Sequence, residues 1–378
     1  MIEQRPRPVL IDARMLFHTG IGNFLRNVLL RRPQDVPAED LEILVSNQVG
    51  MEWAAKHLPG AKIRLWSAPI YGVRSQLLAA RSFWGASSPL LWVPHYNVPL
   101  AWRGPLLTTV HDAIPLALPE LFSPLARLYA KLEYWAVARK SRRVLCNSNF
   151  TVGEFIRYTG CEASKVEGRL LGLDPWWFEG TRSSSAARTD PPYIVFVGNV
   201  RPLKNLANLI LAFRQLRARR RVELKIVGNE KGFISGAGEG SRLRDLDCEG
   251  VHFTGYLSND ELRATLDNAE ILVMPSLYEG FGLPSIEGMA RGCLVAVSDI
   301  PVFREVCGPH ASYFDQKDPT SIARVLEDLL DIPQAEKTER RQRALEAARA
   351  MTWDAIAQLH WREIHRLMPR AASSIPET

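Results

Sequence analysis

The 378-residue sequence lacks the patterns that mark several large classes of protein. Its five cysteines are scattered, leave an odd one over and form no Cys-x-x-Cys spacing, so we expect neither a disulfide framework nor a zinc site. Its eight histidines show no His-Glu-x-x-His or similar ligand spacing. No apolar run has the length of a membrane span, and no charged-then-apolar leader opens the chain. These absences predict a cytoplasmic protein in a reducing compartment.

The composition is that of a globular protein, with 46% hydrophobic and 23% charged residues and a mean hydropathy of −0.10. The length exceeds one ordinary core and predicts two domains. Residues 1–185 carry 22 Lys and Arg against 15 Asp and Glu, and the remainder carries 25 against 26. The basic half favours an anionic partner, such as a membrane surface or a lipid pyrophosphate. Nucleic acid is disfavoured as a partner, because no recognised nucleic-acid module is visible.

Short apolar runs alternate with helical stretches in both halves of the chain, which favours parallel sheets covered by helices. Residues 181–192 break all periodicity and predict a linker. We therefore predict an α/β protein with two Rossmann-like doubly wound domains, residues 1–182 and 193–350, followed by a helical segment over 351–378. The expected strands cover residues 9–13, 41–45, 90–93, 106–110 and 143–147 in the first domain and 193–197, 223–227, 251–253, 271–274 and 294–297 in the second.

The segment from Tyr278 to Gly288 places two carboxylates eight residues apart around a glycine-rich turn that becomes a helix. Pro284 suits the first helical position. Free N–H groups at the helix start would face a phosphate, and carboxylate oxygens accept hydrogen bonds from sugar hydroxyls. The segment therefore predicts a sugar-nucleotide site. Its candidate residues are Glu279, Gly280, Phe281, Gly282, Leu283 and Glu287.

A second candidate region follows the strand expected at residues 193–197. Its loop begins at Gly198 and carries Arg201 and Lys204 three residues apart before a helix. A guanidinium fork and a point charge at this spacing suit a diphosphate. Gly228 ends the next strand of the same domain and adds a candidate backbone contact.

The first domain has three groups of candidate residues after its strands. Because ligands bind beyond the carboxyl ends of parallel strands, we expect these groups near a ligand. A glycine-containing loop follows the first strand, with a helix expected from about residue 23; its exposed N–H groups suit a phosphate or a sugar. The candidates are Gly20 and Gly22 in this loop, His111 after the strand at 106–110, and His95 and Asn97 after the strand at 90–93.

The paired glutamates and the stretch at residues 198–205 resemble motifs of the retaining GT-B glycosyltransferases of glycosyltransferase family 4. Within that family the stretch at residues 198–205 and the stretch from Pro94 to Pro99 look like those of bacterial polysaccharide mannosyltransferases. The resemblance implies two Rossmann-like domains facing across a cleft, with the last helix crossing back to the first domain. It implies a nucleoside-diphosphate sugar as co-substrate, with no metal and no other cofactor. The implied catalytic residues are His111, Arg201, Lys204 and Glu279, with the diphosphate on Arg201 and Lys204, the sugar on Glu279 and His111, the ribose on Glu287, the base near Gly228, and the acceptor near His95 and Asn97.

The function that follows is retaining, metal-independent transfer of a hexose to a glycan or lipid-linked acceptor in bacterial surface polysaccharide assembly. GDP-mannose is the first choice of donor, with UDP- and dTDP-sugars left open. The alternatives are a GT-B epimerase or phosphorylase, or a catalytically silent partner subunit. Asp245 and Asp247 have the Asp-x-Asp spacing of metal-dependent transferases, but they lie in a charged stretch before a strand. A peripheral position at the membrane would use residues 71–92, which combine apolar and basic side chains; an ordinary amphipathic core helix is the alternative for this stretch.

Overall fold

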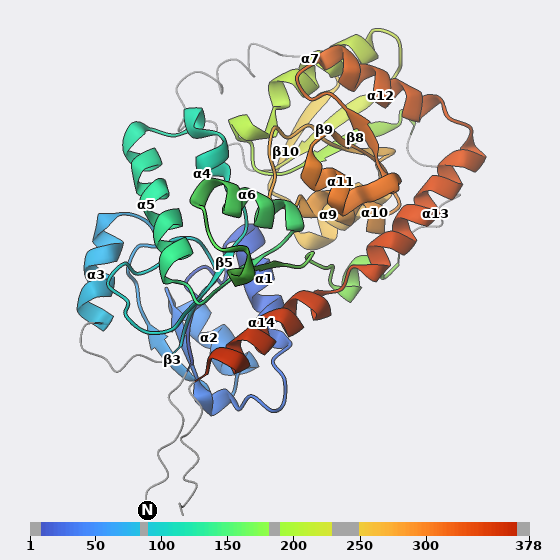
Figure 1. Cartoon of the computed structure of the whole chain (residues 1–378). Helices are drawn as coiled ribbons and strands as arrows, with labels where there is room; N and C mark the ends of the chain where they lie inside the picture. The colour runs from blue at the N-terminus through green and yellow to red at the C-terminus, as the bar shows by residue number, and fades with distance from the viewer. Residues whose placement is uncertain (1–8, 84–89, 181–189, 229–248, 369–378) are drawn as a thin grey trace, which may run out of the picture. The chain divides into compact units, whose positions relative to one another are not determined.

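The computed structural model describes residues 9–83, 90–180, 190–228 and 249–368 (Figure 1). The chain forms two compact units: unit 1 comprises Met1–Leu171 with Trp353–Thr378, and unit 2 comprises Gly172–Thr352. The division therefore falls after Leu171. The expected linker at 181–192 lies for the most part outside the described residues.

Unit 1 is built on a seven-stranded sheet in which all neighbouring strands are parallel, in the order β3-β2-β1-β4-β5-β6-β7. The strand order reverses between β1 and β4, which is the point where doubly wound sheets bind ligands. The central strands are buried on both faces, as parallel sheets require, and this explains their mostly apolar sequences. The bounds are β1 Val9–Asp12, β2 Leu41–Val45, β3 Lys62–Leu65, β4 Leu91–Val93, β5 Leu106–Val110, β6 Arg143–Cys146 and β7 Val166–Gly168.

The helices of unit 1 cover this sheet, and the last helix of the chain, α14, packs on the first, α1. In that contact Trp361 Nε1 donates to the carbonyl oxygen of Val28 at 2.8 Å. Helix α13 ends at Ala350 and α14 begins at Trp353, so the helical segment predicted after residue 350 is a separate helix. The bounds in unit 1 are α1 Thr19–Leu30, α2 Gln48–His57, α3 Val73–Phe83, α4 Ile114–Ala117, α5 Pro124–Lys140, α6 Asn149–Thr159 and α14 Trp353–Leu367.

The start of α1 differs from the sequence-based expectation. The helix begins at Thr19 rather than near residue 23, so Gly20 and Gly22 lie in its first turn and not in a preceding loop. The helix can start early because Gly22 has no side chain. A Cβ at that position would lie 2.6 Å from the carbonyl oxygen of Leu16. Tertiary packing thus overrides the low helix propensity of glycine here.

Unit 2 contains a six-stranded parallel sheet in the order β10-β9-β8-β11-β12-β13. Its strand order reverses between β8 and β11. Both units therefore have the predicted α/β, doubly wound character. The bounds are β8 Tyr193–Val197, β9 Glu223–Val227, β10 Val251–Gly255, β11 Ile271–Met274, β12 Leu294–Ser298 and β13 Ser312–Phe314, with α7 Leu206–Arg217, α9 Asn259–Asn268, α10 Leu283–Ala290, α11 Pro301–Cys307, α12 Pro319–Asp331 and α13 Gln334–Ala350.

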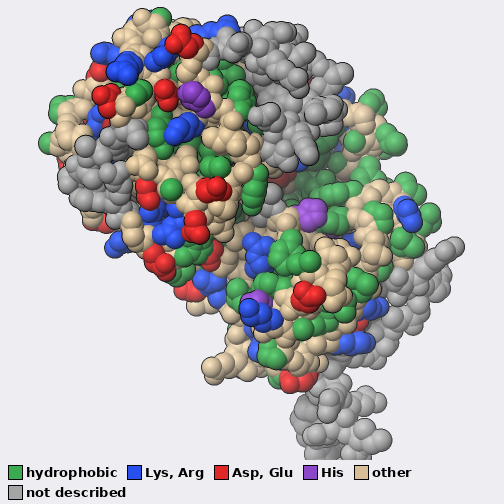
Figure 2. All heavy atoms as spheres, turned by 180° about the vertical axis from the view of Figure 1, so that it is seen from behind, with side chains coloured by type: hydrophobic (Ala, Val, Ile, Leu, Met, Phe, Trp, Pro, Cys, Tyr) green, Lys and Arg blue, Asp and Glu red, His purple; other side chains and the backbone are tan. Residues whose placement is uncertain are grey.

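The described surface mixes charges of both signs. In Figure 2 basic and acidic side chains are interspersed over the drawn face, with hydrophobic side chains between them. A mixed surface of this kind keeps a protein in solution without a large field of one sign.

Candidate active site

Two loops meet at the carboxyl edge of the unit 2 sheet. The first follows β8 and contains a 3-10 turn, Pro202–Lys204, and the second follows β11. Asn205 adopts a left-handed conformation, with φ at 57°, and its Nδ2 donates to the carbonyl oxygen of Pro275 at 3.0 Å. The N–H of Leu277 donates to the carbonyl oxygen of Leu203 at 2.8 Å. These bonds hold the cationic loop against the loop that carries the first glutamate.

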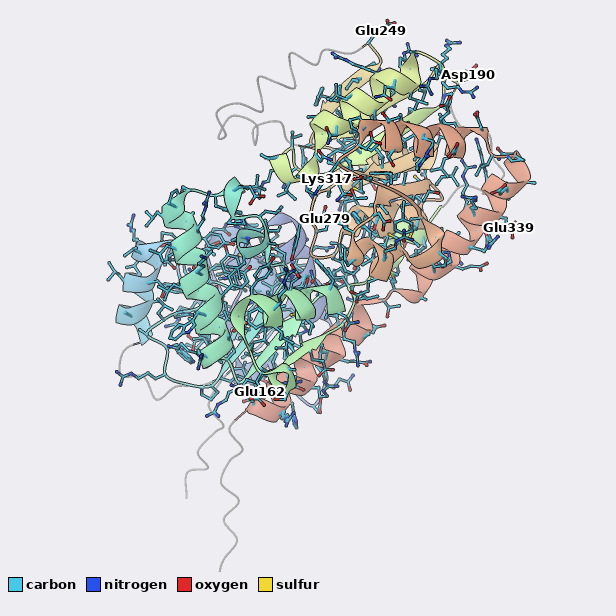
Figure 3. All side chains as sticks on the ribbon, turned by 45° about the horizontal axis from the view of Figure 1, so that its top comes forward. Glu162, Asp190, Glu249, Glu279, Lys317 and Glu339 are labelled. Atoms are coloured by element: carbon cyan, nitrogen blue, oxygen red, sulfur yellow. The ribbon has the colours of Figure 1, made fainter. Side chains whose placement is uncertain are left out.

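Lys204 and Glu279 form an ion pair as a result of this loop contact. Glu279 is buried, and Ser276 Oγ also donates to its Oε1 at 2.7 Å. Figure 3 shows Glu279 on its loop in unit 2. Arg201, at the start of the same turn, is exposed and has no ion pair among the described residues. The edge therefore offers one exposed cation and one cation that orients a carboxylate.

Glycines allow the backbones at this edge to approach one another. A Cβ on Gly228 would lie 1.9 Å from the carbonyl oxygen of Gly198. Gly282 caps α10 with φ at 88°, and a Cβ there would lie 2.5 Å from Cε1 of Phe303. Pro284 occupies the second position of α10, one residue later than expected. At the start of the helix Leu283 carries a backbone N–H that can face an anion, whereas Pro284 has none and the N–H of Ser285 donates to the carbonyl oxygen of Gly282 at 2.9 Å.

Glu287 lies one turn into α10. Burial of its carboxyl group, with the nearby charge of Asp174, raises the pKa of Glu287 to about 8. A carboxyl group of this kind is protonated at neutral pH in the ligand-free chain. It can then donate to a ligand oxygen as well as accept from a hydroxyl group.

At the carboxyl edge of the unit 1 sheet, His111 follows β5. Its Nε2 bonds to the carbonyl oxygen of Pro94 at 2.9 Å, and burial lowers the pKa of His111 to about 4. The ring is therefore neutral, Nε2 carries the proton, and Nδ1 is the acceptor. Donation from His111 to a sugar would require its bond to Pro94 to break.

Asn147 is a candidate that sequence reasoning missed. It follows β6, one position beyond Cys146, which pairs with Val110, so it lies beside His111 at the same edge. Its side chain is buried, and its Oδ1 has no hydrogen-bond partner in the described structure. A polar residue directly after an apolar strand was the available signal.

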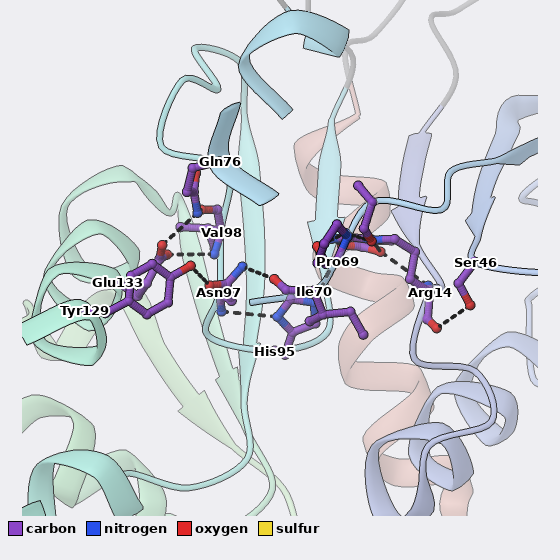
Figure 4. Close-up of polar contacts among 12 residues, drawn as sticks. Arg14, Ser46, Pro69, Ile70, Gln76, His95, Asn97, Val98, Tyr129 and Glu133 are labelled. Atoms are coloured by element: carbon purple, nitrogen blue, oxygen red, sulfur yellow. Dashed lines mark hydrogen bonds and ion pairs between the residues drawn. The ribbon is translucent and has the colours of Figure 1, made fainter. Parts of the chain in front are cut away.

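His95 and Asn97 belong to a buried network in unit 1 (Figure 4). The N–H of Asn97 donates to His95 Nδ1 at 3.1 Å, and its Nδ2 donates to the carbonyl oxygen of Ile70 at 2.5 Å. Tyr129 donates to Asn97 Oδ1, and His95 Nε2 lies 3.5 Å from Asp12 Oδ2. Both side chains therefore hold loops together, and an acceptor contact from them stays a prediction.

A small cavity of about 220 Å³ lies near the start of α1, among residues that include Arg14, His18 and Asn47. A Cβ added to Gly20 would have no atom within 4 Å, whereas one added to Gly22 would meet the backbone of Met15 and Leu16. Ligand contact by these two glycines stays a prediction.

Among the described residues, no group of three or more His, Cys, Asp and Glu side chains is arranged to hold a metal ion. Asp245 and Asp247 lie outside the described residues. No helix in the described ranges is long and apolar enough to cross a membrane.

Two family models match the chain in succession. Glycosyltransferase Family 4 matches residues 28–175, and Glycosyl transferases group 1 matches residues 178–351. The chain belongs to glycosyltransferase family 4. The two matches meet close to the division of the units after Leu171.

The chain is also similar to curated mannosyltransferases. It is 33% identical over 233 residues to an MMP alpha-(1->4)-mannosyltransferase of Mycolicibacterium hassiacum, covering 58% of this chain and 53% of the relative. It is 28% identical over 398 residues to the serotype-specific mannosyltransferase WbdA of Escherichia coli, covering 98% of this chain and 48% of the relative. The chain spans about half the length of these relatives.

Solved structures share the GT-B fold of the family. Sucrose-phosphate synthase from Thermosynechococcus elongatus matches with a TM-score of 0.75 at 17% identity, covering 96% of this chain and 99% of that chain. Anabaena HepE in complex with UDP and glucose matches with a TM-score of 0.72 at 16% identity, covering 95% and 100%. At these identities the likeness shows the fold alone.

Proposed function

We propose that the chain is a retaining, metal-independent mannosyltransferase that uses GDP-mannose and a glycan or lipid-linked acceptor in bacterial surface polysaccharide assembly. The observation that carries the proposal is the cluster at the unit 2 edge: exposed Arg201, the Lys204–Glu279 pair and the N-terminus of α10. Cations and helix N–H groups stabilise a diphosphate as its charge grows on departure, which replaces a divalent ion. Relatives named as mannosyltransferases support the choice of sugar.

Each residue has a distinct role in this proposal. Arg201 and Lys204 bind the diphosphate, Glu279 binds sugar hydroxyls, Glu287 binds the ribose, and His111 contacts the sugar. Lys204 has three N–H donors, so it can bond a phosphate oxygen while it still orients the carboxylate of Glu279. The other donor contacts are assigned to the backbone around Gly20, Gly22, Gly198, Gly228, Gly280, Phe281, Gly282 and Leu283.

The proposed transfer needs no side-chain nucleophile. The acceptor hydroxyl attacks C1 of the sugar from the face that the diphosphate leaves. The bond from C1 to the phosphate oxygen breaks, and a bond from C1 to the acceptor oxygen forms on the same face. The leaving phosphate takes the acceptor proton, so charge and configuration are both preserved.

Thermal shifts with bare nucleoside diphosphates test the assignment of the donor. In EDTA, GDP is expected to raise the melting temperature more than UDP or dTDP, because ligand stabilisation follows affinity. NMR of the product formed from GDP-mannose then tests its anomeric configuration. A larger shift with UDP would assign uracil rather than guanine as the base of the donor. A product of inverted configuration would contradict the retaining mechanism.

An anionic membrane surface is a further proposed partner, which would place the enzyme peripherally on the membrane. The excess of basic residues in residues 1–185 supports this partner. Arg74, Arg139 and Arg142 are exposed, whereas Arg143 is bound in ion pairs within unit 1. Trp84 and the side chain of Arg81, which contributed to the sequence-based expectation, lie outside the described residues.

A further inference from the structure

Helix α5 exposes an apolar stripe that the sugar-transfer site does not use. Leu125, Leu128, Leu132 and Trp135 recur at intervals of three and four residues, and each is between 44% and 77% exposed. The opposite side of the helix, with Tyr134 and Val137, is buried in the core of unit 1. A surface helix ordinarily turns its apolar side inward and its polar side to water, so a second apolar side indicates a binding surface.

Helix α3 borders this stripe and extends it (Figure 1). The N–H of Gly72 donates to the hydroxyl of Tyr129 at 3.2 Å, and Gln76 Nε2 donates to Glu133 Oε1 at 2.7 Å. Tyr129 and Glu133 each directly follow a leucine of the stripe in the sequence. Tyr71, Val73 and Leu77, on α3 or just before it, are exposed apolar residues as well. We call the combined surface the α3–α5 face: Tyr71, Val73, Leu77, Leu125, Leu128, Leu132 and Trp135.

The charges on these two helices indicate what kind of partner this face binds. Their exposed charged side chains are Arg74, Lys131 and Arg139, and no exposed carboxylate occurs on the described part of either helix. A second copy of this face would bring cations against cations, which is unfavourable. Leucine and tryptophan beside lysine and arginine are the composition of helices that lie at the surface of an anionic bilayer.

We propose that the α3–α5 face docks unit 1 on an anionic phospholipid bilayer. This inference rests on the proposed membrane association and names its surface, with α5 as the principal element. The side chains of the stripe enter the boundary between headgroups and acyl chains, and the three cations contact lipid phosphates. The carboxyl group of Glu133 stays beneath the face, where it accepts hydrogen bonds from Gln76 and from the N–H of Val98.

Vesicle flotation with the full chain tests the proposal. The probes are vesicles of phosphatidylcholine alone and vesicles with about one-third phosphatidylglycerol, at about 50 mM and about 500 mM salt. The chain is expected to float with the anionic vesicles at low salt. Its partitioning onto the neutral vesicles, or onto the anionic vesicles at high salt, is expected to be at least about tenfold weaker. Absence of flotation at low salt, or equal partitioning on both vesicle types, would overturn the proposal.

Matched variants localise the contact. The double variant Leu128→Gln/Leu132→Gln keeps the charge and is expected to weaken partitioning about tenfold or more. Lys131→Gln/Arg139→Gln is expected to weaken it about fivefold for each cation. Leu30→Gln, an exposed leucine on α1, is the control and is expected to leave partitioning unchanged. Equal losses in the control and the stripe variants would overturn the assignment to α5, as would a dimer in light scattering that the stripe variants dissociate.

Activity separates this inference from the proposed function. The release of nucleotide from the donor with a water-soluble acceptor is expected to be the same in the stripe variants and the unaltered chain. Loss of flotation with normal release supports the docking face. Normal flotation without any transfer would contradict the proposed function and leave the docking face supported.

Discussion

The carboxyl edge of the unit 2 sheet carries accessible ionic groups, whereas the same edge of unit 1 carries buried polar groups that bond to one another. In unit 2, Arg201 is exposed, and the ion pair of Lys204 within the described part of the chain is with Glu279, which belongs to the same site. In unit 1, the guanidinium of Arg14 is held by Asp12 and by backbone carbonyls, and His111 is neutral. The difference supports the proposed assignment of the donor diphosphate to unit 2.

Removing the cations of unit 2 should have the largest effect. Arg201→Ala and Lys204→Ala are each expected to lower kcat/KM by about 100-fold or more, because each loses stabilisation of the departing diphosphate. Steady-state kinetics with GDP-mannose measure the loss. Arg343→Ala removes a cation of α13 that pairs with Glu339, and it is the control. Losses below about threefold in both site variants would contradict the charge assignment.

Acid should lower the free energy of unfolding of unit 1, because two of its histidines are buried in the neutral form. Burial lowers the pKa of His111 to about 4 and that of His360, which accepts from Thr109, to about 3. In the unfolded chain these histidines take up protons near pH 6.5. The stability that the neutral rings provide is therefore complete above that pH, and it falls as the pH drops toward the pKa values of the folded chain. Between about pH 7 and pH 5 the free energy of unfolding should fall by about 2 kcal/mol for each histidine.

Urea melts of His360→Gln across the same pH range measure how much His360 contributes to the loss of unfolding free energy in acid. The variant should be less stable at neutral pH, because it disturbs a buried hydrogen bond, and its stability should depend less on pH. The same slope in the variant and the unaltered chain would show that His360 is not the source of the acid sensitivity.

The two glutamates sharpen the comparison within unit 2 through the affinity for bare GDP, whose expected change is the smallest of these effects. Glu287→Ala is expected to weaken binding of bare GDP about tenfold, because the ribose loses a partner. Glu279→Ala is expected to leave GDP binding close to that of the unaltered chain while sugar transfer is lost, since only the sugar is assigned to it. Calorimetry with GDP on both variants distinguishes them, and equal losses of affinity would remove the division of roles.

The fold could be predicted where physical signals are strong. The central strands are mostly apolar because both of their faces are buried, and the sequence identified them within a residue or two. Strands β3, β7 and β13 were missed. All three are short strands at the edges of the sheets. Both ends of Lys62–Leu65 are exposed, and Val166–Gly168 ends in glycine.

The candidate site was only partly accessible to sequence reasoning. The spacing of Arg201 and Lys204 indicated a diphosphate site. The contact of Lys204 with Glu279 was not predicted, because it follows from the packing of two loops around the left-handed Asn205, which no local pattern requires. Helix α5 shows a second limit. Its two apolar sides are both periodic, and only the packed structure shows that Tyr134 is buried and Leu128 is exposed.

Calorimetric titration of GDP into the chain in EDTA tests the central claim most directly, because it asks whether protein cations alone hold the diphosphate. We expect GDP to bind in EDTA with an affinity that Mg²⁺ or Mn²⁺ does not change by more than about threefold, and we expect Lys204→Ala to weaken binding at least about tenfold. Binding that appears only after a divalent ion is added, or that Lys204→Ala leaves unchanged, would contradict the metal-independent assignment of the unit 2 edge.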